Sequence, residues 1–124
     1  MTQSAELILI ADDDVEMLQT LSCLLEKEGY KVITVENGKS AVADSKKQLP
    51  ALILLDIHMP VMDGIKALAE IKSNKMTKHI PVIMLTVEGS LSEIQQAINL
   101  GARTYITKPS TGGEILKAVK GILS

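Results

Sequence analysis

Carboxylate side chains follow two apolar segments of this sequence, and a group of carboxylates can bind a metal ion or supply a nucleophile. The segment ILIA leads into Asp12, Asp13 and Asp14, and the segment LILL leads into Asp56. If the two segments form neighbouring strands, these carboxylates lie together, and like charges this close cannot all stay ionised without a compensating cation. The pattern therefore predicts an acidic site that binds a cation.

Two more polar residues follow apolar segments nearer the C-terminus. Thr86 follows VIML, and Lys108 follows TYIT. Lys108 supplies one positive charge, and Mg²⁺ could supply more, because it accepts oxygen ligands and commonly joins one or two carboxylates to a phosphate. An aspartate nucleophile, a metal ion, a lysine and a hydroxyl together indicate a phosphoryl-transfer centre. The sequence lacks the phosphate-binding motif GxxxxGK[ST], so a nucleotide is a poor candidate for the substrate.

Each of these residues also has a simpler interpretation. A single aspartate after a strand most often caps the next helix, so Asp13 or Asp14 could be a helix cap. Thr86 could be a turn residue, and Lys108 could be a solvated surface lysine. The combination favours a site, because four of the five predicted strands end at a chemically useful residue and the fold brings these ends together.

The elements that must position these residues alternate along the chain. Short aliphatic or β-branched runs alternate with longer segments of helical periodicity, which is typical of βα units around a parallel sheet. Ligands of such sheets bind beyond the carboxyl ends of the strands. The sequence predicts an α/β fold with strands at 7–11, 31–35, 51–56, 81–86 and 104–107.

Five helices are expected between and after the strands. Val15, Leu18, Leu21 and Leu25 are spaced for one buried face of the first helix, and Gly29 can supply its left-handed C-cap. The other helices are expected at 38–47, at 64–73, from Ser90 to Gly101, and from Thr111 onward. The helix that ends at Gly101 has the weakest apolar stripe, so we expect it to be the least firmly held element.

The composition is that of one ordinary domain. The chain has 124 residues, of which 46% are hydrophobic and only 2% aromatic, so the core must be aliphatic. The 13 basic and 15 acidic residues form no long block, which argues against direct binding of nucleic acid. Cys23, the only cysteine, lies in LSCLL and is expected to be buried and inert. The sequence has no basic leader and no membrane-length apolar segment, so we expect a cytoplasmic protein without membrane insertion.

Taken together, the stretches ILIADDD, LILLDIHMPVMDG, VIMLT and GARTYITKP resemble the receiver domain of two-component response regulators, of the single-domain kind related to chemotaxis regulators. The resemblance implies one receiver domain over residues 1–124, with a flavodoxin-like (βα)5 doubly wound fold and strand order 2-1-3-4-5. It implies that Asp56 accepts a phosphoryl group from a histidine kinase or a histidine phosphotransfer protein, in a reaction that depends on Mg²⁺ or Mn²⁺. Such a protein catalyses its own phosphotransfer and autodephosphorylation and is not a conventional enzyme.

The resemblance also implies roles for individual residues. Thr86 matches a switch hydroxyl that moves toward the phosphoryl group, and Tyr105 matches an aromatic that turns inward behind it. Lys108 matches a lysine that pairs with the phosphoryl oxygens. The face made by the fourth helix, fifth strand and fifth helix would act on a downstream protein, either in a monomer or in a phosphorylation-induced dimer. The implied metal ligands are Asp12, Asp13, Asp56 and the main-chain carbonyl of His58.

Three residues near the implied site are expected to tune the lifetime of the phosphoryl group. Val87 stands where the family usually has a smaller residue, so its methyl groups could narrow access to Asp56. His58 and Glu88 occupy positions that, in the family, affect how fast water removes the phosphoryl group. Glu88 could orient that water or repel it, and the sequence leaves both alternatives open.

Other functions agree less well with the same residues. A phosphorylation-independent scaffold with a vestigial acidic pocket is the main alternative, and Val87 is its best support. A flavin-binding protein would need aromatic side chains that the chain lacks, and its anionic cofactor would meet an acidic crevice. A hydrolase of the aspartyl-phosphate type would have a second Asp where His58 stands.

Overall fold

The computed structural model describes residues 5–87, 91–108 and 112–123, and in it five strands alternate with five helices. The strands are β1 (Leu7–Ala11), β2 (Lys31–Val35), β3 (Leu52–Asp56), β4 (Val82–Val87) and β5 (Thr104–Lys108). The helices are α1 (Val15–Lys27), α2 (Gly38–Gln48), α3 (Gly64–Ser73), α4 (Leu91–Asn99) and α5 (Gly112–Leu123). These bounds agree with the predicted elements to within one or two residues, although the predicted helix starts Ser90 and Thr111 lie outside the described residues.

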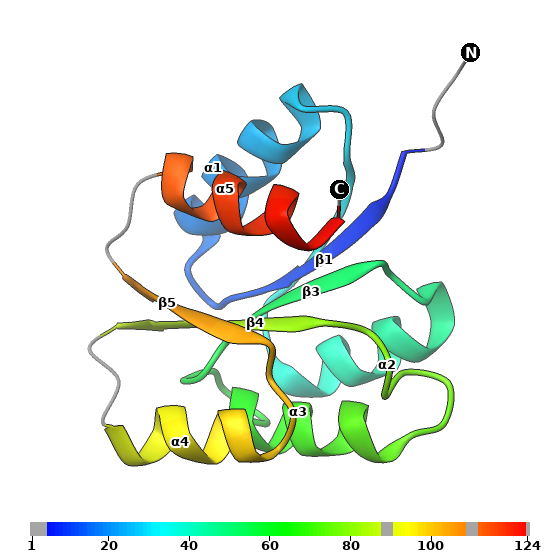
Figure 1. Ribbon diagram of the computed structural model, residues 1–124, viewed down its shortest axis with the longest axis vertical. Coiled ribbons are helices and arrows are strands. Elements are labelled where there is room, and N and C mark those ends of the chain that lie inside the picture. Colours follow the sequence, from blue (N-terminus) through cyan, green and yellow to red (C-terminus); the bar gives the residue numbers. More distant parts are fainter. Residues whose placement is uncertain (1–4, 88–90, 109–111, 124) are drawn as a thin grey trace.

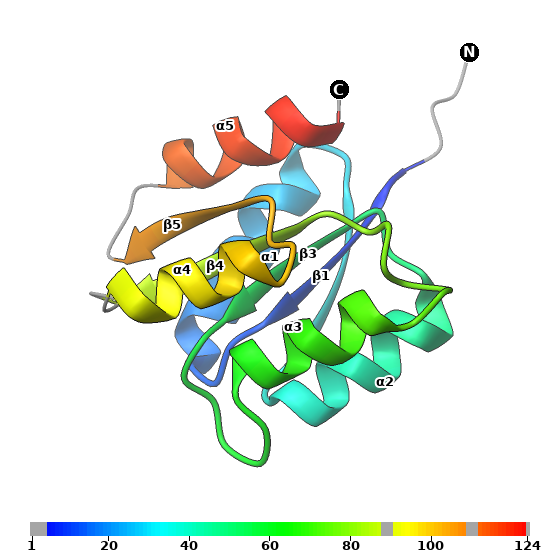
Figure 2. The same cartoon turned by 60° about the horizontal axis from the view of Figure 1, so that its bottom comes forward.

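The five strands form one parallel sheet in the order β2-β1-β3-β4-β5, as expected. Helices α1 and α5 cover one face, and α2, α3 and α4 cover the other (Figures 1 and 2). The central strands are buried on both faces, since every side chain from Leu52 to Asp56 in β3 is buried. Such continuous apolar strands are typical of a parallel sheet covered by helices on both sides. The strand order reverses between β1 and β3, so a crevice is expected at their carboxyl ends.

Helix α1 begins and ends at residues with clear local causes. The side chain of Asp14 accepts a hydrogen bond from the main-chain N–H of Met17, so Asp14 is the N-cap and Asp13 is left for other contacts. Gly29, just beyond the helix, has a φ of 95°, a conformation that glycine adopts at low cost. Both features match the sequence-based expectations.

Two predictions for α1 were wrong. Cys23 is exposed rather than buried, because Leu21 and Leu25 occupy the core side and a residue midway between them points the opposite way. Val15 is 50% exposed, because it is the first residue of the helix and lies beyond the part that packs on the sheet. The buried face of α1 is therefore formed by Leu18, Leu21 and Leu25 alone.

Helix α4 is the helix with the smallest buried face in the described part of the chain. Ala97 is its one buried residue, whereas α1 and α3 each bury larger side chains such as Leu25 and Ile71. Ile98 remains 43% exposed. The weak apolar stripe expected from the sequence is therefore present, and little packing fixes the position of this helix on the sheet.

No helix within the described ranges is both long and apolar enough to cross a membrane.

Candidate functional site

The register of the sheet brings the predicted site residues to one edge. Ala11 of β1 pairs with Leu55 of β3, so Asp12 and Asp56, which follow them, lie on adjacent strands. Across the next strand pair, Asp56 lies opposite Leu85, and Thr86 comes one residue later. Lys108 lies opposite Val87 at the end of β5. All these residues are therefore at the carboxyl end of the sheet, the edge at which parallel sheets bind ligands where the strand order switches.

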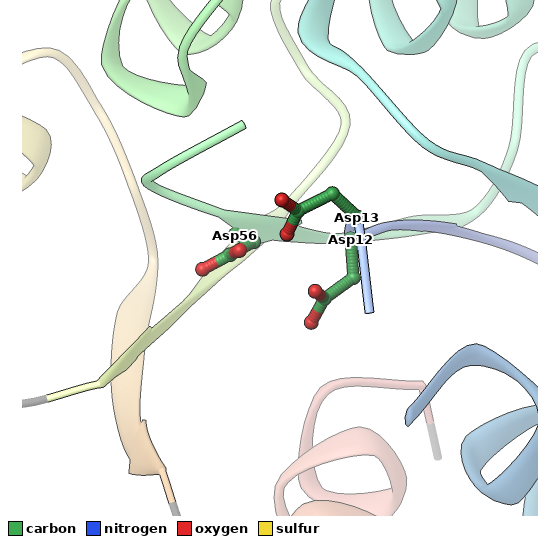
Figure 3. A group of neighbouring side chains, drawn as sticks. All are labelled: Asp12, Asp13 and Asp56. Carbon is green, nitrogen blue, oxygen red and sulfur yellow. The ribbon is translucent and has the colours of Figure 1, made fainter. Parts of the chain in front are cut away.

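Three carboxylates form a cluster at this edge of the sheet, at the ends of β1 and β3 (Figure 3). One oxygen each from Asp12, Asp13 and Asp56 can be chosen so that all three atoms lie within 4.8 Å of one another. Asp12 and Asp56 are buried, whereas Asp13 is exposed. A hard divalent cation prefers such an all-oxygen set, and one open side leaves room for water and phosphate oxygens. The residues present therefore fit Mg²⁺.

The environment of Asp56 disfavours its charged form. Burial of its carboxyl group, with help from the negative charge of Asp12, raises the pKa of Asp56 from 3.8 to about 6. The positive charge of Lys108 and a hydrogen bond from the main-chain N–H of Ile57, 2.9 Å from Oδ1, act in the opposite direction and only partly offset the burial. At neutral pH the carboxyl group of Asp56 is ionised, although burial makes this charged form unfavourable in free energy. A bound cation would reduce that free-energy cost.

Lys108 supplies the positive charge of the site. Its Nζ lies 2.6 Å from Oδ2 of Asp12 and 3.6 Å from Oδ1 of Asp56. The lysine side chain is nearly buried, so these contacts are shielded from water. Lys108 therefore bridges two of the three carboxylates.

Thr86 follows Leu85, the sheet partner of Asp56, whereas Tyr105 lies opposite Met84 on the edge strand β5, and the two residues differ in burial. Thr86 is completely buried, and its Oγ1 has no hydrogen-bond partner among the described residues. An unpaired buried hydroxyl costs free energy, so such a group often has a functional explanation. Tyr105 is 42% exposed and follows the outward-facing pattern of β5, so the aromatic ring is at the surface.

Comparison with known proteins decides the family. The family model described as the response regulator receiver domain matches residues 8–120. This chain is a response regulator receiver domain. It therefore belongs to the proteins that carry signals in two-component systems.

Relatives of this receiver domain include single-domain and longer proteins. Protein PilH of Pseudomonas aeruginosa is 34% identical over 117 residues, which cover 94% of this chain and 97% of PilH. The phosphate regulon transcriptional regulatory protein PhoB of the same organism is 36% identical over 116 residues, which cover 94% of this chain and 51% of PhoB. The receiver domain thus spans nearly the whole of one relative and about half the length of the other.

Solved structures agree with the fold. Chemotaxis protein CheY4 of Vibrio cholerae superimposes with a TM-score of 0.90 at 29% identity, covering 96% of this chain and 99% of CheY4. The receiver domain of the sensor histidine kinase PA1611 of Pseudomonas aeruginosa superimposes with a TM-score of 0.88 at 26% identity, covering 97% and 98% of the two chains. That structure is described as holding a magnesium ion in its active site cleft.

The loop from β3 to α3 of this receiver domain is held against its surroundings by close backbone packing. A Cβ atom on Gly64 would overlap the main-chain carbonyl oxygen of Asp56, and one on Gly38 would overlap that of Met62. The N–H of Gly38 donates to the carbonyl of Met62, and the N–H of Gly64 donates to that of Ile57. The two glycines therefore allow the chain after Asp56 to fold back closely.

Val61 in the same loop has a strained backbone. Its φ is 70°, and the N–H of Met62 donates to the carbonyl of Pro60, which closes a tight γ-turn around it. A β-branched residue in this region of φ is a true outlier. The side chain is 78% exposed, so no burial of the valine compensates for this strain.

One contact at the site was not expected from the sequence. Nε2 of His58, in the loop after β3, lies 3.2 Å from Oε1 of Glu93 in the first turn of α4. In the sequence, Glu93 stands only as the residue three positions after Ser90, the predicted start of this helix, which lies outside the described residues. Two residues 35 positions apart gave no periodic signal, so only the three-dimensional fold could join them.

The structure describes two of the three residues that are expected to tune the lifetime of the phosphoryl group. His58 is 67% exposed in its side chain and points its ring to α4. Val87 is the last residue of β4, opposite Lys108, and Glu88 lies outside the described residues. Their expected effects on the lifetime of a phosphoryl group stay predictions.

Proposed function

We propose that this receiver domain accepts a phosphoryl group on Asp56, from a phosphohistidine of a histidine kinase or a histidine phosphotransfer protein. The observation that carries the proposal is that Asp56 lies beside the carboxylates of Asp12 and Asp13 and within 3.6 Å of the nearly buried Lys108. An Oδ atom of Asp56 attacks phosphorus, the P–N bond to the donor histidine breaks, and the donor imidazole leaves with the electron pair. Hydrolysis then breaks the new P–O bond by attack of water on phosphorus and restores the carboxylate.

Carboxylates and a carbonyl would hold the metal ion of this reaction. Asp12, Asp13 and Asp56 offer carboxylate oxygens, and the main-chain carbonyl of His58 is the proposed fourth protein ligand. Mg²⁺, or Mn²⁺ in its place, would neutralise charge on the phosphoryl oxygens. Lys108 would turn from Asp12 and Asp56 to the phosphoryl oxygens, because the new dianionic group is a stronger partner than either carboxylate.

The unpaired hydroxyl of Thr86 supports a switch that follows phosphorylation. A phosphoryl group on Asp56 would give this buried hydroxyl an acceptor, and Thr86 would move toward it. Tyr105 would turn inward from its exposed position as the threonine moves. The face of α4, β5 and α5 would then change its shape toward a downstream protein target, in a monomer or a phosphorylation-induced dimer, and in the cytoplasm.

Intact-mass spectrometry after incubation with acetyl phosphate tests the proposal. We expect one added phosphoryl group that requires both Mg²⁺ and Asp56, so Asp56→Asn should gain none. The matched control is Asp63→Asn, which changes the N-cap of α3 to another good cap and should be phosphorylated like the original protein. A protein that gains no phosphoryl group from acetyl phosphate or from a phosphohistidine donor would instead support the phosphorylation-independent scaffold.

A further inference from the structure

The contact between His58 and Glu93 joins the crevice to the helix that is least fixed by packing. His58 lies two residues after Asp56, and Glu93 lies in the first turn of α4. Figure 1 shows that α4 lies beside α3 on one face of the sheet. The distance of 3.2 Å between Nε2 and Oε1 is short enough for a hydrogen bond or an ion pair. A change at the crevice can therefore reach α4 through this one pair of side chains.

The loose packing of α4 allows a single pair of side chains to influence the position of this helix. Ala97 is the one buried residue of the helix, so apolar burial holds α4 weakly. A groove of about 360 Å³ separates part of α4 from α3, and its lining includes Ile65, Ala69 and Gln96 as well as the two paired residues. Because this space is not filled by side chains, α4 can shift without a large steric penalty. A surface pair that is too weak to stabilise a rigid helix can still select the position of a loosely packed one.

Phosphorylation would act directly against the pair. His58 would contribute its main-chain carbonyl to the metal ion, so a rearrangement of the site moves the backbone that carries the imidazole. A contact of 3.2 Å does not survive a displacement of about one ångström.

We propose that Glu93 is a positioning residue for the phosphoryl-transfer site. Through its contact with His58, Glu93 holds α4 in the position of the unphosphorylated protein and thereby opposes phosphorylation. The inference rests on the proposed function at Asp56. By linkage, removing a contact that only the unphosphorylated state makes shifts the protein toward the phosphorylated arrangement. The resulting change in the free energy of phosphorylation equals the interaction free energy of the His58–Glu93 pair, and it is therefore small.

Two measurements on five proteins test the proposal. The proteins are the original chain, Glu93→Ala, His58→Ala and the double variant, with Gln96→Ala as a control in the same groove. The first readout is amide exchange of α4 in the unphosphorylated protein, and the second is the affinity for beryllofluoride, an analogue of the phosphoryl group, in the presence of Mg²⁺. Each single variant should exchange faster in α4 and bind beryllofluoride about twofold to fivefold more tightly.

The double variant distinguishes loss of the His58–Glu93 contact from a direct effect of the substitutions on the stability of α4. Loss of Glu93 also removes a favourable negative charge from the first turn of α4, but His58→Ala leaves the helix sequence intact. The double variant should therefore resemble the single ones instead of adding their effects. Additive effects, or unchanged α4 exchange in His58→Ala, would overturn the proposal. Absence of beryllofluoride binding in every protein would count against phosphorylation at Asp56 instead, and α4 exchange would still test the pair.

Discussion

Replacing Asp56 by asparagine should stabilise the protein in a way that depends on pH. The buried carboxyl group has a pKa of about 6 in the folded protein and about 3.8 when it is solvated, so folding favours its protonated form. Asparagine resembles that neutral form, and its Oδ1 can still accept the hydrogen bond from the N–H of Ile57. The substitution therefore removes an unfavourable charge and keeps the local contacts.

The magnitude follows from the difference between the two pKa values. A difference of about two pKa units corresponds to about 3 kcal/mol of unfolding free energy. The folded protein binds the proton more tightly than the unfolded chain, so the stability of the original protein falls as the pH rises from about 4 to about 6. The advantage of Asp56→Asn should thus be near zero at about pH 4 and reach about 3 kcal/mol above about pH 7.

Urea unfolding followed by circular dichroism, at a series of pH values and with a chelator present, measures this advantage. Asp44→Asn is the control for loss of an aspartate from the surface helix α2, outside the acidic cluster. With excess Mg²⁺ the gap between Asp56→Asn and the original protein should narrow, because the cation compensates the charge of Asp56. An advantage that is the same at every pH, or a less stable Asp56→Asn, would refute the explanation of the raised pKa.

Three other substitutions test local features of the site by thermal or urea unfolding. Thr86→Val should stabilise the unphosphorylated protein by about 1 kcal/mol, because it removes a buried hydroxyl that has no partner among the described residues; a loss of stability would mean that the hydroxyl is hydrogen-bonded in solution. Val61→Gly should also stabilise the folded protein by about 1 kcal/mol, because relief of the backbone strain at φ 70° exceeds the entropy cost of glycine. An unchanged melting temperature would argue against this strain. Gly64→Ala should destabilise by about 2–3 kcal/mol and slow phosphorylation by acetyl phosphate, because its Cβ would displace the carbonyl of Asp56; normal stability would show that the loop adapts freely.

The fold could be predicted from the sequence because its signals are local. Each strand is a short apolar run, and caps such as Asp14, Asn37 and Asp63 each accept a hydrogen bond from the first turn of their helix. The convergence of Asp12 and Asp56 followed from one assumption, that β1 and β3 are neighbours, and the register bears this assumption out. Cys23 was misplaced because a run of apolar residues does not reveal which side of the helix faces the sheet.

Other features of the site depend on the whole fold. The raised pKa of Asp56 arises from burial, which a sequence does not display, and the unpaired hydroxyl of Thr86 is visible only when its neighbours are placed. The left-handed backbone of Val61 gave no signal, because valine rarely adopts it. The pairing of His58 with Glu93 depends on how α4 lies beside α3.

Chemical mapping of the phosphorylated residue tests the central claim most directly. Borohydride reduces an aspartyl phosphate to homoserine, and peptide sequencing by mass spectrometry then locates the changed residue. After phosphorylation in the presence of Mg²⁺, we expect homoserine at position 56 and unchanged aspartate at positions 12, 13 and 63. Homoserine at one of those other positions, or at none, would contradict the assignment of Asp56 as the residue that accepts the phosphoryl group.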